Sequence, residues 1–314
     1  MLNNKPRISI GMPVYNGEQF LQEALNSILT QTFEDFELII SDNASTDRTK
    51  EICQEYAAKD RRIRYYRNQE NLGAGWNINR VFELSTGKYF KWNAHDDNCA
   101  PEFLERCIEV LDQDPSVVLC YPKITLIDEQ GKFIRNWNGL NCLVPPKPMT
   151  KLNSSKPHER FGELVAPHMC YQIFGLIRAS ALKRTPLFGT YSAADNVLLA
   201  RLGLLGRFYQ LPEYLFYSRN HPQQSYQVCD DDYKYAEWWD PKNKGQVMLP
   251  HMKILFEYLH AISSTPLNLP EKTYCYAHTL RFVRWFRELM IRELIFAAKK
   301  LSERRPHILV NQKG

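Results

Sequence analysis

Several patterns that identify common classes of protein are absent from this sequence of 314 residues. None of the eight cysteines belongs to a C-x-x-C pair, so a zinc ribbon and a thioredoxin-type dithiol are both disfavoured. No apolar run approaches the roughly 18 residues of a membrane span, and no long apolar stretch precedes the first predicted strand. We therefore expect a cytoplasmic protein with isolated, reduced thiols.

The composition is that of a soluble globular protein, with 44% apolar and 24% charged residues. The length predicts one large α/β domain with an appendage, or two domains. The formal net charge is +5, and the segment 279–305 carries eight basic and three acidic residues, which is also +5. The rest of the chain is therefore neutral, which is not typical of a nucleic-acid-binding protein.

Strand and helix patterns alternate over the first 120 residues. A helix with an apolar stripe over 20–29 follows the first strand, and Asn16 is a candidate N-cap for it. The predicted strands are 7–13, 36–41, 63–66, 89–92 and 117–121, and the later helices are 49–58, 76–84 and 101–111. This alternation predicts a doubly wound, mostly parallel sheet with helices on both faces.

The pattern becomes less regular after residue 121. We expect a hairpin around Gly131, a loop over 144–157, a helix over 191–205 and an extended segment over 207–219. Residues 220–240 are rich in acids and aromatics and are predicted to form a mobile loop. A helical C-terminal region closes the chain.

Polar clusters follow four of the predicted strands. They are Asn16-Gly17, DNASTD (42–47), NLGAGWN (71–77) and AHDDN (94–98). The carboxyl ends of parallel strands meet at one edge of the sheet, where ligands of doubly wound folds bind. All four clusters are therefore expected at this edge.

Asp42 occupies the tip of the second strand, where an acid commonly contacts a nucleoside. The first strand is followed by GMPVYNGEQF, which contains neither G-x-G-x-x-G nor a Walker lysine. These features favour a nucleotide held by its base and ribose, with its phosphates neutralised by a metal. In the alternative interpretation, Asp42 and Asn43 only cap the following helix.

Asp96 and Asp97 are adjacent acids after an aromatic strand. One or two carboxylates together with substrate phosphates form a typical site for Mg²⁺ or Mn²⁺. His95 is expected to point away from the acids. In the alternative interpretation, AHDDN is a solvated turn that caps the next helix.

PVYNGEQFL, DNASTD, NLGAGWN and AHDD, in this order, resemble the family-2 glycosyltransferases of the GT-A fold over residues 7–225. The resemblance implies transfer of a sugar, with inversion, from a nucleotide-diphosphate donor, usually a UDP-sugar, to a hydroxyl, with help from Mn²⁺ or Mg²⁺. The implied nucleotide-binding residues are Pro13, Val14, Tyr15, Asn16, Asp42, Asn71, Gly73, Asn77, Asp96 and Arg219. The implied metal ligands are Asp96, Asp97 and His221.

The second half adds two matches to the family pattern. SAADNVLLARL resembles the segment whose Asp is the general base, which implies this role for Asp195. YSRNHPQQS implies that Arg219 clamps a phosphate and that His221 is a metal ligand or a diphosphate donor. The chain departs from the pattern at Ala94 and Ala194, where the family has acids. Asp195 as a plain N-terminal helix acid and His221 as a structural histidine remain alternatives.

The resemblance implies a GT-A catalytic domain over 1–225, with a nucleotide-binding half (1–121) and an acceptor-binding half (122–225), followed by a loop and helical extension (226–314). The expected partners are a nucleotide-sugar donor and a glycan or lipid-linked acceptor, as in polysaccharide biosynthesis, without nucleic acid. Two alternative functions are a non-catalytic nucleotide-sugar-binding protein and a nucleotidyltransferase. The latter would need a basic, glycine-rich loop after the first strand.

The C-terminal segment has apolar residues at helical spacing. Phe282, Val283, Phe286, Leu289, Met290, Leu294, Ala297 and Leu301 share one face, and only Glu293 interrupts it. Such a helix would place residues 279–305 on an anionic inner membrane face, near a lipid-linked acceptor. Packing on the catalytic domain or on a second subunit of a homodimer fits the same pattern.

Overall fold

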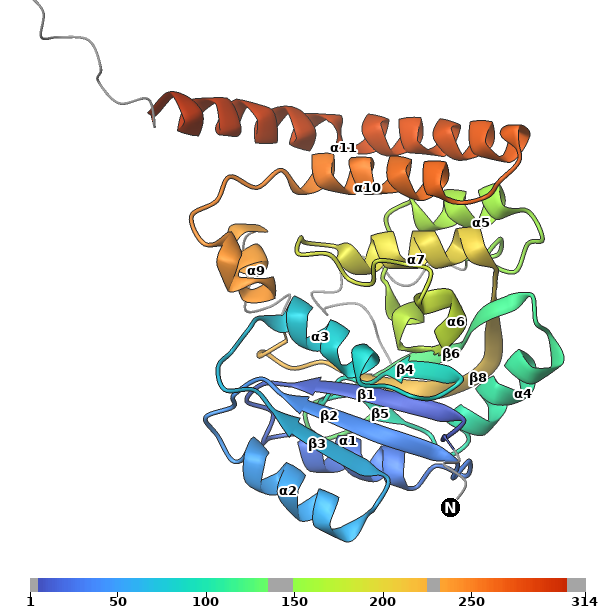
Figure 1. The fold of residues 1–314 in the computed structure, drawn as a ribbon, viewed down its shortest axis with the longest axis vertical. Coiled ribbons are helices and arrows are strands. Elements are labelled where there is room, and N and C mark those ends of the chain that lie inside the picture. Colours follow the sequence, from blue (N-terminus) through green and yellow to red (C-terminus); the bar gives the residue numbers. More distant parts are fainter. Residues whose placement is uncertain (1–4, 135–148, 225–231, 304–314) are drawn as a thin grey trace, which may run out of the picture.

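The structure is a computed structural model that describes residues 5–134, 149–224 and 232–303. Its centre is an eight-stranded sheet with the order β3-β2-β1-β4-β7-β6-β8-β5 (Figure 1). The strands are β1 (Ile8–Val14), β2 (Phe36–Asp42), β3 (Ile63–Arg67), β4 (Tyr89–Trp92), β5 (Asn98–Cys99), β6 (Val117–Ile127), β7 (Leu176–Arg178) and β8 (Arg207–Arg219).

The sheet is mixed but mostly parallel, as predicted. β1 pairs in parallel with β2 and β4, β2 with β3, and β6 with β8. The short strand β7, which was not predicted, lies antiparallel between β4 and β6. A strand of three residues is too short to show periodicity, because a sequence pattern needs several residues to repeat.

Helices cover both faces of the sheet, as expected for this fold class. They are α1 (Leu21–Leu29), α2 (Thr49–Lys59), α3 (Ala74–Glu83), α4 (Phe103–Gln113), α5 (Pro157–Leu164), α6 (Ala179–Leu182), α7 (Ala194–Leu205), α9 (Asp232–Trp239), α10 (Pro250–Ser264) and α11 (Leu269–Glu303), with 3-10 turns at Tyr171–Phe174 and Pro241–Asn243. One apolar core lies under α1, α2 and α4, and a second extends from the other face through α7 to α11.

α7 explains why a further helical layer exists. Its residues are apolar on all sides, and nine of its twelve residues are buried, which is the pattern of a helix covered on two faces. α10 and α11 provide the outer cover. The rings of Phe161, Tyr258 and Phe282 connect α5, α10 and α11, with centroids 5.8 Å and 5.4 Å apart. Arg201 on α7 binds Glu257 on α10 at 2.8 Å.

α11 packs on the protein through part of the apolar face that the sequence indicated, and Leu289 and Leu294 of that face are exposed. Phe282, Met290 and Ala297 are buried along it. Glu293, which interrupts that face in sequence, accepts hydrogen bonds from the backbone N–H and ring Nδ1 of His251 at the start of α10. Glu271 binds His158 at the start of α5 in the same way. Each carboxylate thus caps the positive end of a neighbouring helix.

Other predictions need correction. Asn16 does not cap α1, whose N-cap is Phe20; its Oδ1 accepts the Thr46 N–H instead. Residues 232–239 form α9 rather than a loop, because aromatic side chains there pack onto α3. The predicted hairpin around Gly131 is present as a turn with one bridge, between Ile127 and Phe133. Its end after residue 134, and residues 225–231, lie outside the described residues.

Within the described residues, no helix combines the length and the apolar composition that a bilayer crossing requires. The predicted division of the chain after residue 225 stays a prediction.

Candidate active site

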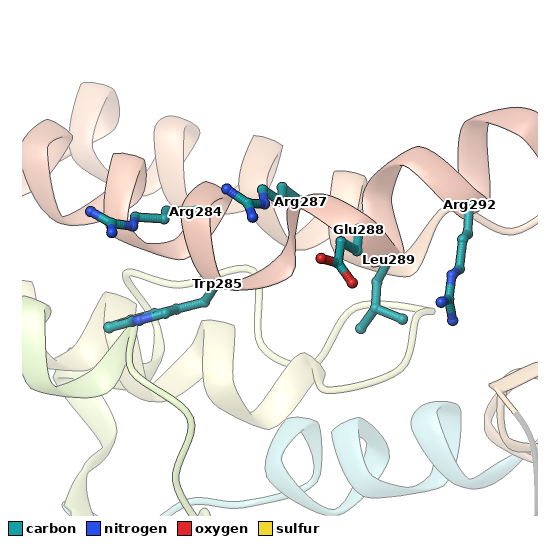
Figure 2. A pocket seen from close by; sticks show the side chains of 6 residues that line it. All are labelled: Arg284, Trp285, Arg287, Glu288, Leu289 and Arg292. Atoms are coloured by element: carbon teal, nitrogen blue, oxygen red, sulfur yellow. The ribbon is translucent and has the colours of Figure 1, made fainter.

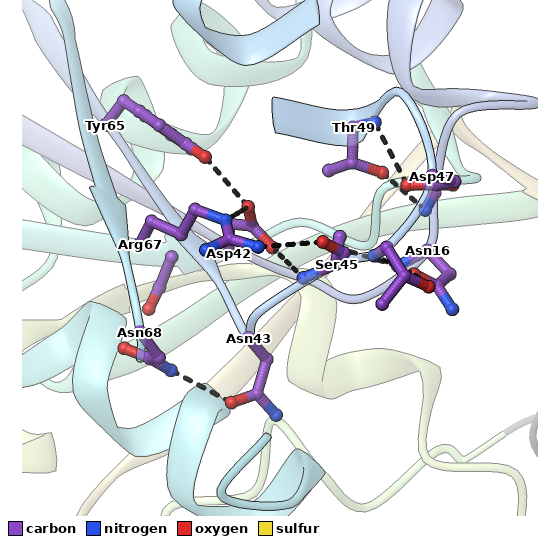
Figure 3. A network of polar contacts seen from close by, with 12 residues as sticks. Asn16, Asp42, Asn43, Ser45, Asp47, Thr49, Tyr65, Arg67 and Asn68 are labelled. Carbon is purple, nitrogen blue, oxygen red and sulfur yellow. Dashed lines mark hydrogen bonds and ion pairs between the residues drawn. The ribbon is translucent and has the colours of Figure 1, made fainter. Parts of the chain in front are cut away.

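Asp42 is the centre of a polar network at the carboxyl end of β2 (Figure 3). It is fully buried, and its Oδ1 accepts the backbone N–H of Ser45 at 2.8 Å. Its Oδ2 accepts the Tyr65 hydroxyl at 2.8 Å and Arg67 Nε at 3.1 Å, both from β3. Asp42 therefore holds the DNASTD loop against β3, and Arg67 is a partner that the sequence did not indicate.

Asn43 connects the loops that follow β2 and β3. Its Nδ2 donates to Asn71 Oδ1 at 2.7 Å and to the Gly73 carbonyl at 3.2 Å. Gly73 has φ 90°, a value that suits glycine, and directly precedes α3. On α3, Asn77 exchanges hydrogen bonds with the hydroxyl and carbonyl of Ser41. Asn71, Gly73 and Asn77 thus share one network with Asp42, as their predicted positions at strand ends required.

The end of β1 lies beside this network. Val14 is buried and its carbonyl accepts the Asn43 N–H at 2.9 Å, which continues the pairing of β1, including Pro13, with β2. Tyr15 is 41% exposed and Asn16 has φ 50°, so the chain turns sharply outward here. The exposed ring of Tyr15 therefore lies at the edge of the sheet where all four motifs meet.

Asp96 and His221 lie side by side, although 125 residues separate them in sequence. His221 Nε2 is 2.8 Å from Asp96 Oδ2, and because a carboxylate only accepts, the imidazole is the donor. Burial alone would raise the pKa of Asp96, but the hydrogen bond from His221 and the positive charges of His95 and His221 lower it overall. The environment therefore keeps Asp96 ionised.

Asp97 faces the interior. Its Oδ1 accepts the Arg219 backbone N–H at 2.9 Å. Burial raises the pKa of Asp97, and the neighbouring charge of Asp96 raises it further. Lys91, fully buried on β4, donates from Nζ to the Trp92 carbonyl and Asn93 Oδ1 and lies over the Phe103 ring. Burial lowers the pKa of Lys91, a residue that the sequence showed only as part of an aromatic strand.

Arg219 is fully buried at the end of β8 and anchors the Asp96 loop. Its Nε donates to the Asp96 carbonyl at 2.9 Å, and its Nη2 to Glu23 Oε2 at 2.5 Å. Its Nη1 donates to the carbonyls of Asp128 and Glu129. Its predicted contact with a phosphate stays a prediction, and would have to compete with these bonds.

Asp195 belongs to a different environment, in the first turn of α7. Its Oδ1 accepts the Asn196 N–H at 2.9 Å. Burial raises the pKa of Asp195, although hydrogen bonds from Asn196 and Cys170 and the charge of His168 oppose the rise. His168 Nδ1 is 2.8 Å from the Ala166 carbonyl, so that nitrogen is protonated and Nε2 faces the Cys170 sulfur at 3.7 Å. No motif in the sequence pointed to His168 or Cys170.

Left-handed backbone conformations occur in several of the predicted site segments. Among the described residues, four that are not glycine have positive φ, and three of them are Asn16, Ala44 and Ala193, each in or next to a predicted site segment. This conformation costs about 1 kcal/mol or more for a side chain with Cβ. Such strain is typical of functional sites, where the surrounding structure overcomes it. Ala193 directly precedes α7 and so sets the direction of Asp195.

α9 covers the start of α3. A Cβ added to Gly75 would lie 2.4 Å from Trp239 Nε1, so a side chain there would displace the indole. Trp239 Nε1 donates to the Gly189 carbonyl at 2.6 Å. Nearby in sequence, Trp76 and Trp238 are 40% and 41% exposed. The NLGAGWN motif is therefore shaped by packing against α9, which explains the second of its glycines.

The residues present fit a divalent cation only if the substrate completes its coordination. The described part of the chain contains no group of three or more His, Cys, Asp or Glu side chains arranged to hold a metal. Asp96 and His221 offer an ionised carboxylate oxygen and an imidazole. His221 Nδ1 is buried with no hydrogen-bond partner among the described residues. Mg²⁺ and Mn²⁺ commonly accept so few protein ligands when diphosphate oxygens and waters fill the remaining positions.

The fold is that of known GT-A-like structures. S. aureus TarS in complex with UDP-GlcNAc matches 89% of this chain and 73% of its own with a TM-score of 0.64 at 19% identity. The mannosyltransferase PcManGT of Pyrobaculum calidifontis, in complex with GDP-Man and Mn²⁺, matches 95% of this chain and 87% of its own with a TM-score of 0.51 at 16% identity. At these identities the likeness concerns the fold alone.

The sequence identifies the family. Residues 9–185 match the glycosyl transferase family 2, and the chain belongs to that family. An uncharacterised glycosyltransferase of Methanocaldococcus jannaschii is 33% identical over 43% of this chain and 47% of its own length. The chondroitin synthase of Escherichia coli is 34% identical over 43% of this chain and 20% of its own. The matched segment thus spans less than half of each of these relatives.

Proposed function

We propose that this chain is an inverting, metal-assisted glycosyltransferase that moves a sugar from a nucleotide-diphosphate donor to a hydroxyl of a glycan or lipid-linked acceptor. A UDP-sugar is the proposed donor, in keeping with the UDP-GlcNAc bound to TarS, which has a similar fold. The proposal keeps Asp195 as general base and Asp96 as the first metal-binding residue.

The family match carries the proposal, and the surroundings of two carboxylates support it. Two carboxylates predicted for opposite roles have pKa values displaced in opposite directions: that of Asp96 is lowered and that of Asp195 is raised. A carboxylate that binds a cation and diphosphate must stay charged, whereas a general base works best with a pKa nearer to the working pH. Opposed shifts of this kind are the usual mark of assigned roles in a catalytic site.

In the proposed reaction, the Asp195 carboxylate accepts the proton of the acceptor hydroxyl. The hydroxyl oxygen attacks the anomeric carbon of the donor from the side opposite the leaving group, and the bond from that carbon to the diphosphate oxygen breaks. The nucleoside diphosphate leaves with the electron pair. Attack from the opposite face inverts the configuration, and one base is sufficient because no enzyme-bound sugar is formed.

The remaining predicted residues bind the donor in this scheme. Asp42 and the loop around Tyr15 would border the nucleoside, and the Asn43–Asn71 contact would keep the loops in place for it. Asp96 with His221 would hold the cation, with Asp97 behind them. When bound, the cation supplies positive charge that neutralises the departing diphosphate.

A non-catalytic nucleotide-sugar-binding protein is the second candidate, and the two missing family acids favour it. Ala194 is buried in the apolar core beside Asp195, and Ala94 occupies the first position of the acidic motif. A chain that had lost transfer could keep the strand-end loops and donor binding.

Transfer by purified wild-type protein, Asp195→Asn and Asp96→Ala distinguishes the two candidates. UDP release would be measured with a panel of UDP-sugars, Mn²⁺ and glycan or lipid acceptors. For the enzyme we expect Asp195→Asn to lower turnover about 10²–10⁴-fold, the range that general base catalysis contributes. Asp195→Asn should still raise the melting temperature with donor and Mn²⁺, because bound ligand stabilises the folded state, and Asp96→Ala should not.

Glu102→Gln is a matched control, since Glu102 is an exposed acid five residues after Asp97. It should retain both turnover and the melting shift. Wild-type-like transfer by Asp195→Asn would remove the role of that residue. Donor binding by the wild-type protein without transfer or donor hydrolysis, over the whole panel, would favour the binding protein.

A further inference from the structure

The exposed surface of α11 is unlike the rest of the described surface. Among the described residues, sixteen large apolar side chains are exposed, and ten of them lie on α11. Monomeric proteins normally scatter such residues, and a concentration of them marks a surface for interaction. These side chains are additional to Phe282, Met290 and Ala297, which are buried.

The exposed apolar residues alternate with arginines along the helix. We define the outer face of α11 as Leu280, Arg284, Arg287, Ile291 and Ile295, which lie within an 80° arc at 100° per residue. All five are exposed, and Leu280, Ile291 and Ile295 are 69%, 54% and 64% exposed. In Figure 1, α11 is the outermost layer, with α10 between it and α7. The exposure of all five residues places the outer face on the solvent side of this layer.

A shallow hollow of about 540 Å³ lies on α11 next to the outer face. Figure 2 shows Trp285, Leu289 and Arg292 projecting to the same side of α11 from successive turns, with Arg284 at one end. The Arg281 guanidinium lies 5.0 Å from the centre of the Trp285 ring. An indole beside guanidinium groups is typical of a helix at a lipid–water boundary, where rings take the headgroup level and cations meet phosphates.

Charge decides which partner this surface fits. The exposed cations Arg281, Arg284, Arg287, Arg292 and Lys299 face solvent along α11, and Glu288 is the exposed acid among them. Glu293 is half-buried and holds His251, so it does not offset them. A second copy of α11 would bring these like charges together, whereas an anionic surface would be attracted by them. A nucleic acid would leave Leu280, Ile291 and Ile295 without an apolar partner.

We propose that the outer face of α11 binds the surface of a bilayer that contains anionic lipids. Its apolar side chains enter the interface, and its arginines contact lipid phosphates. The structure changes the prediction made from sequence, because the stripe through Phe282 and Met290 is used for internal packing and a different face is free. The C-terminal half of α11 extends past the start of α10, toward the side where α9 lies against α3 at the loop after β3 (Figure 1).

Vesicle co-sedimentation of the full chain tests this proposal. Vesicles of phosphatidylcholine with phosphatidylglycerol would be compared with pure phosphatidylcholine. The wild-type protein should pellet with the anionic vesicles and remain in solution with the neutral ones. The triple variant Arg284→Gln, Arg287→Gln, Arg292→Gln should partition more than tenfold less, since each basic residue near an anionic surface contributes a factor of about five. High salt should have a similar effect on the wild-type protein.

Two further variants test whether binding depends on the position of the charges and on the apolar side chains of α11. The control Lys50→Gln, Arg61→Gln, Lys183→Gln removes the same charge from exposed positions off α11 and should pellet like the wild-type protein. The variant Leu280→Ser, Ile291→Ser, Ile295→Ser keeps every charge and should also lose binding. A blue shift of tryptophan fluorescence on vesicle addition, lost in Trp285→Phe, would place the hollow in the interface.

The proposal is overturned if the wild-type protein does not pellet, or if the α11 and control charge variants bind equally. It is also overturned if light scattering shows a dimer that the serine variant dissociates, because the face would then be covered by a second copy.

Discussion

The two proposed functional carboxylates lie in regions that are held together by different forces. Asp96 belongs to strand-end loops that are tied by side-chain hydrogen bonds, and Arg219 alone donates four of them, three to carbonyls and one to a carboxylate. Asp195 belongs to a helical layer in which nine of the twelve residues of α7 are buried, mostly by apolar contacts. The first region lowers the pKa of its carboxylate, and the second raises the pKa of its carboxylate.

The largest expected effect tests the polar region. Arg219→Met removes a buried cation and leaves the Asp96 and Glu129 carbonyls without their donors. We expect the free energy of unfolding to fall by about 3–5 kcal/mol, as when one partner of a buried charged network is removed. Urea denaturation measures it. Arg61→Met, at an exposed site, should change stability by less than about 0.5 kcal/mol, and a similarly small effect at Arg219 would show that the loop does not depend on it.

The second prediction compares the two carboxylates directly, in metal-free protein at pH 7.5. Asp96→Asn should lower the free energy of unfolding by about 1–3 kcal/mol, because it weakens a charged hydrogen bond to His221. Asp195→Asn should raise it by about 1 kcal/mol, because a buried charge is removed from a functional position. Thermal and urea unfolding of both variants check the opposite signs.

The pH dependence follows from the directions of the shifts. The pKa of Asp96 is lowered by folding, so its stabilisation is present above the unfolded pKa of about 3.9 and is lost as the pH falls through the folded value. The pKa of Asp195 is raised, so it favours the fold at low pH and ceases to do so as the pH rises through the folded value. The gain from Asp195→Asn should therefore vanish toward pH 4. A constant gain would contradict the assignment.

The third prediction concerns the join between α11 and α10. Glu293→Gln should destabilise the protein by about 1 kcal/mol, because the start of α10 loses a negative cap. Glu288→Gln removes the same charge from an exposed position five residues earlier and should have almost no effect. Thermal unfolding of the pair measures the difference, and equal midpoints would mean that apolar packing alone holds α10 to α11.

The smallest effect is expected at the start of α7. Ala193→Gly relieves a left-handed residue, worth about 1–2 kcal/mol, but increases the freedom of the unfolded chain by about 0.5–1 kcal/mol. We expect a net gain of about 0.5 kcal/mol. Ala298→Gly, inside exposed α11, should instead lose about 0.5–1 kcal/mol. Opposite signs in urea unfolding would confirm that Ala193 is strained, and a loss at both positions would contradict it.

Prediction from sequence succeeded where a pattern repeats within a short window. β1 and β2 are mostly apolar, and their polar ends place Asn16 and Asp42 at the same edge. It failed for β7, which is too short to show a period. It also failed for α9, because the packing of its aromatic residues against α3 cannot be seen in the local sequence. Glu293 appeared to break an apolar face, because its partner His251 is 42 residues away.

The amino-acid sequence by itself determined the alternating elements, the family, and which polar residues end the strands, because these depend on local spacing and on motifs. Only the tertiary structure decided that Asp96 faces His221 while Asp97 faces inward, that Cys170 and His168 lie beside Asp195, and which face of α11 is free. These features depend on contacts between segments far apart in the chain, and burial and charge at such contacts are properties of the folded state alone.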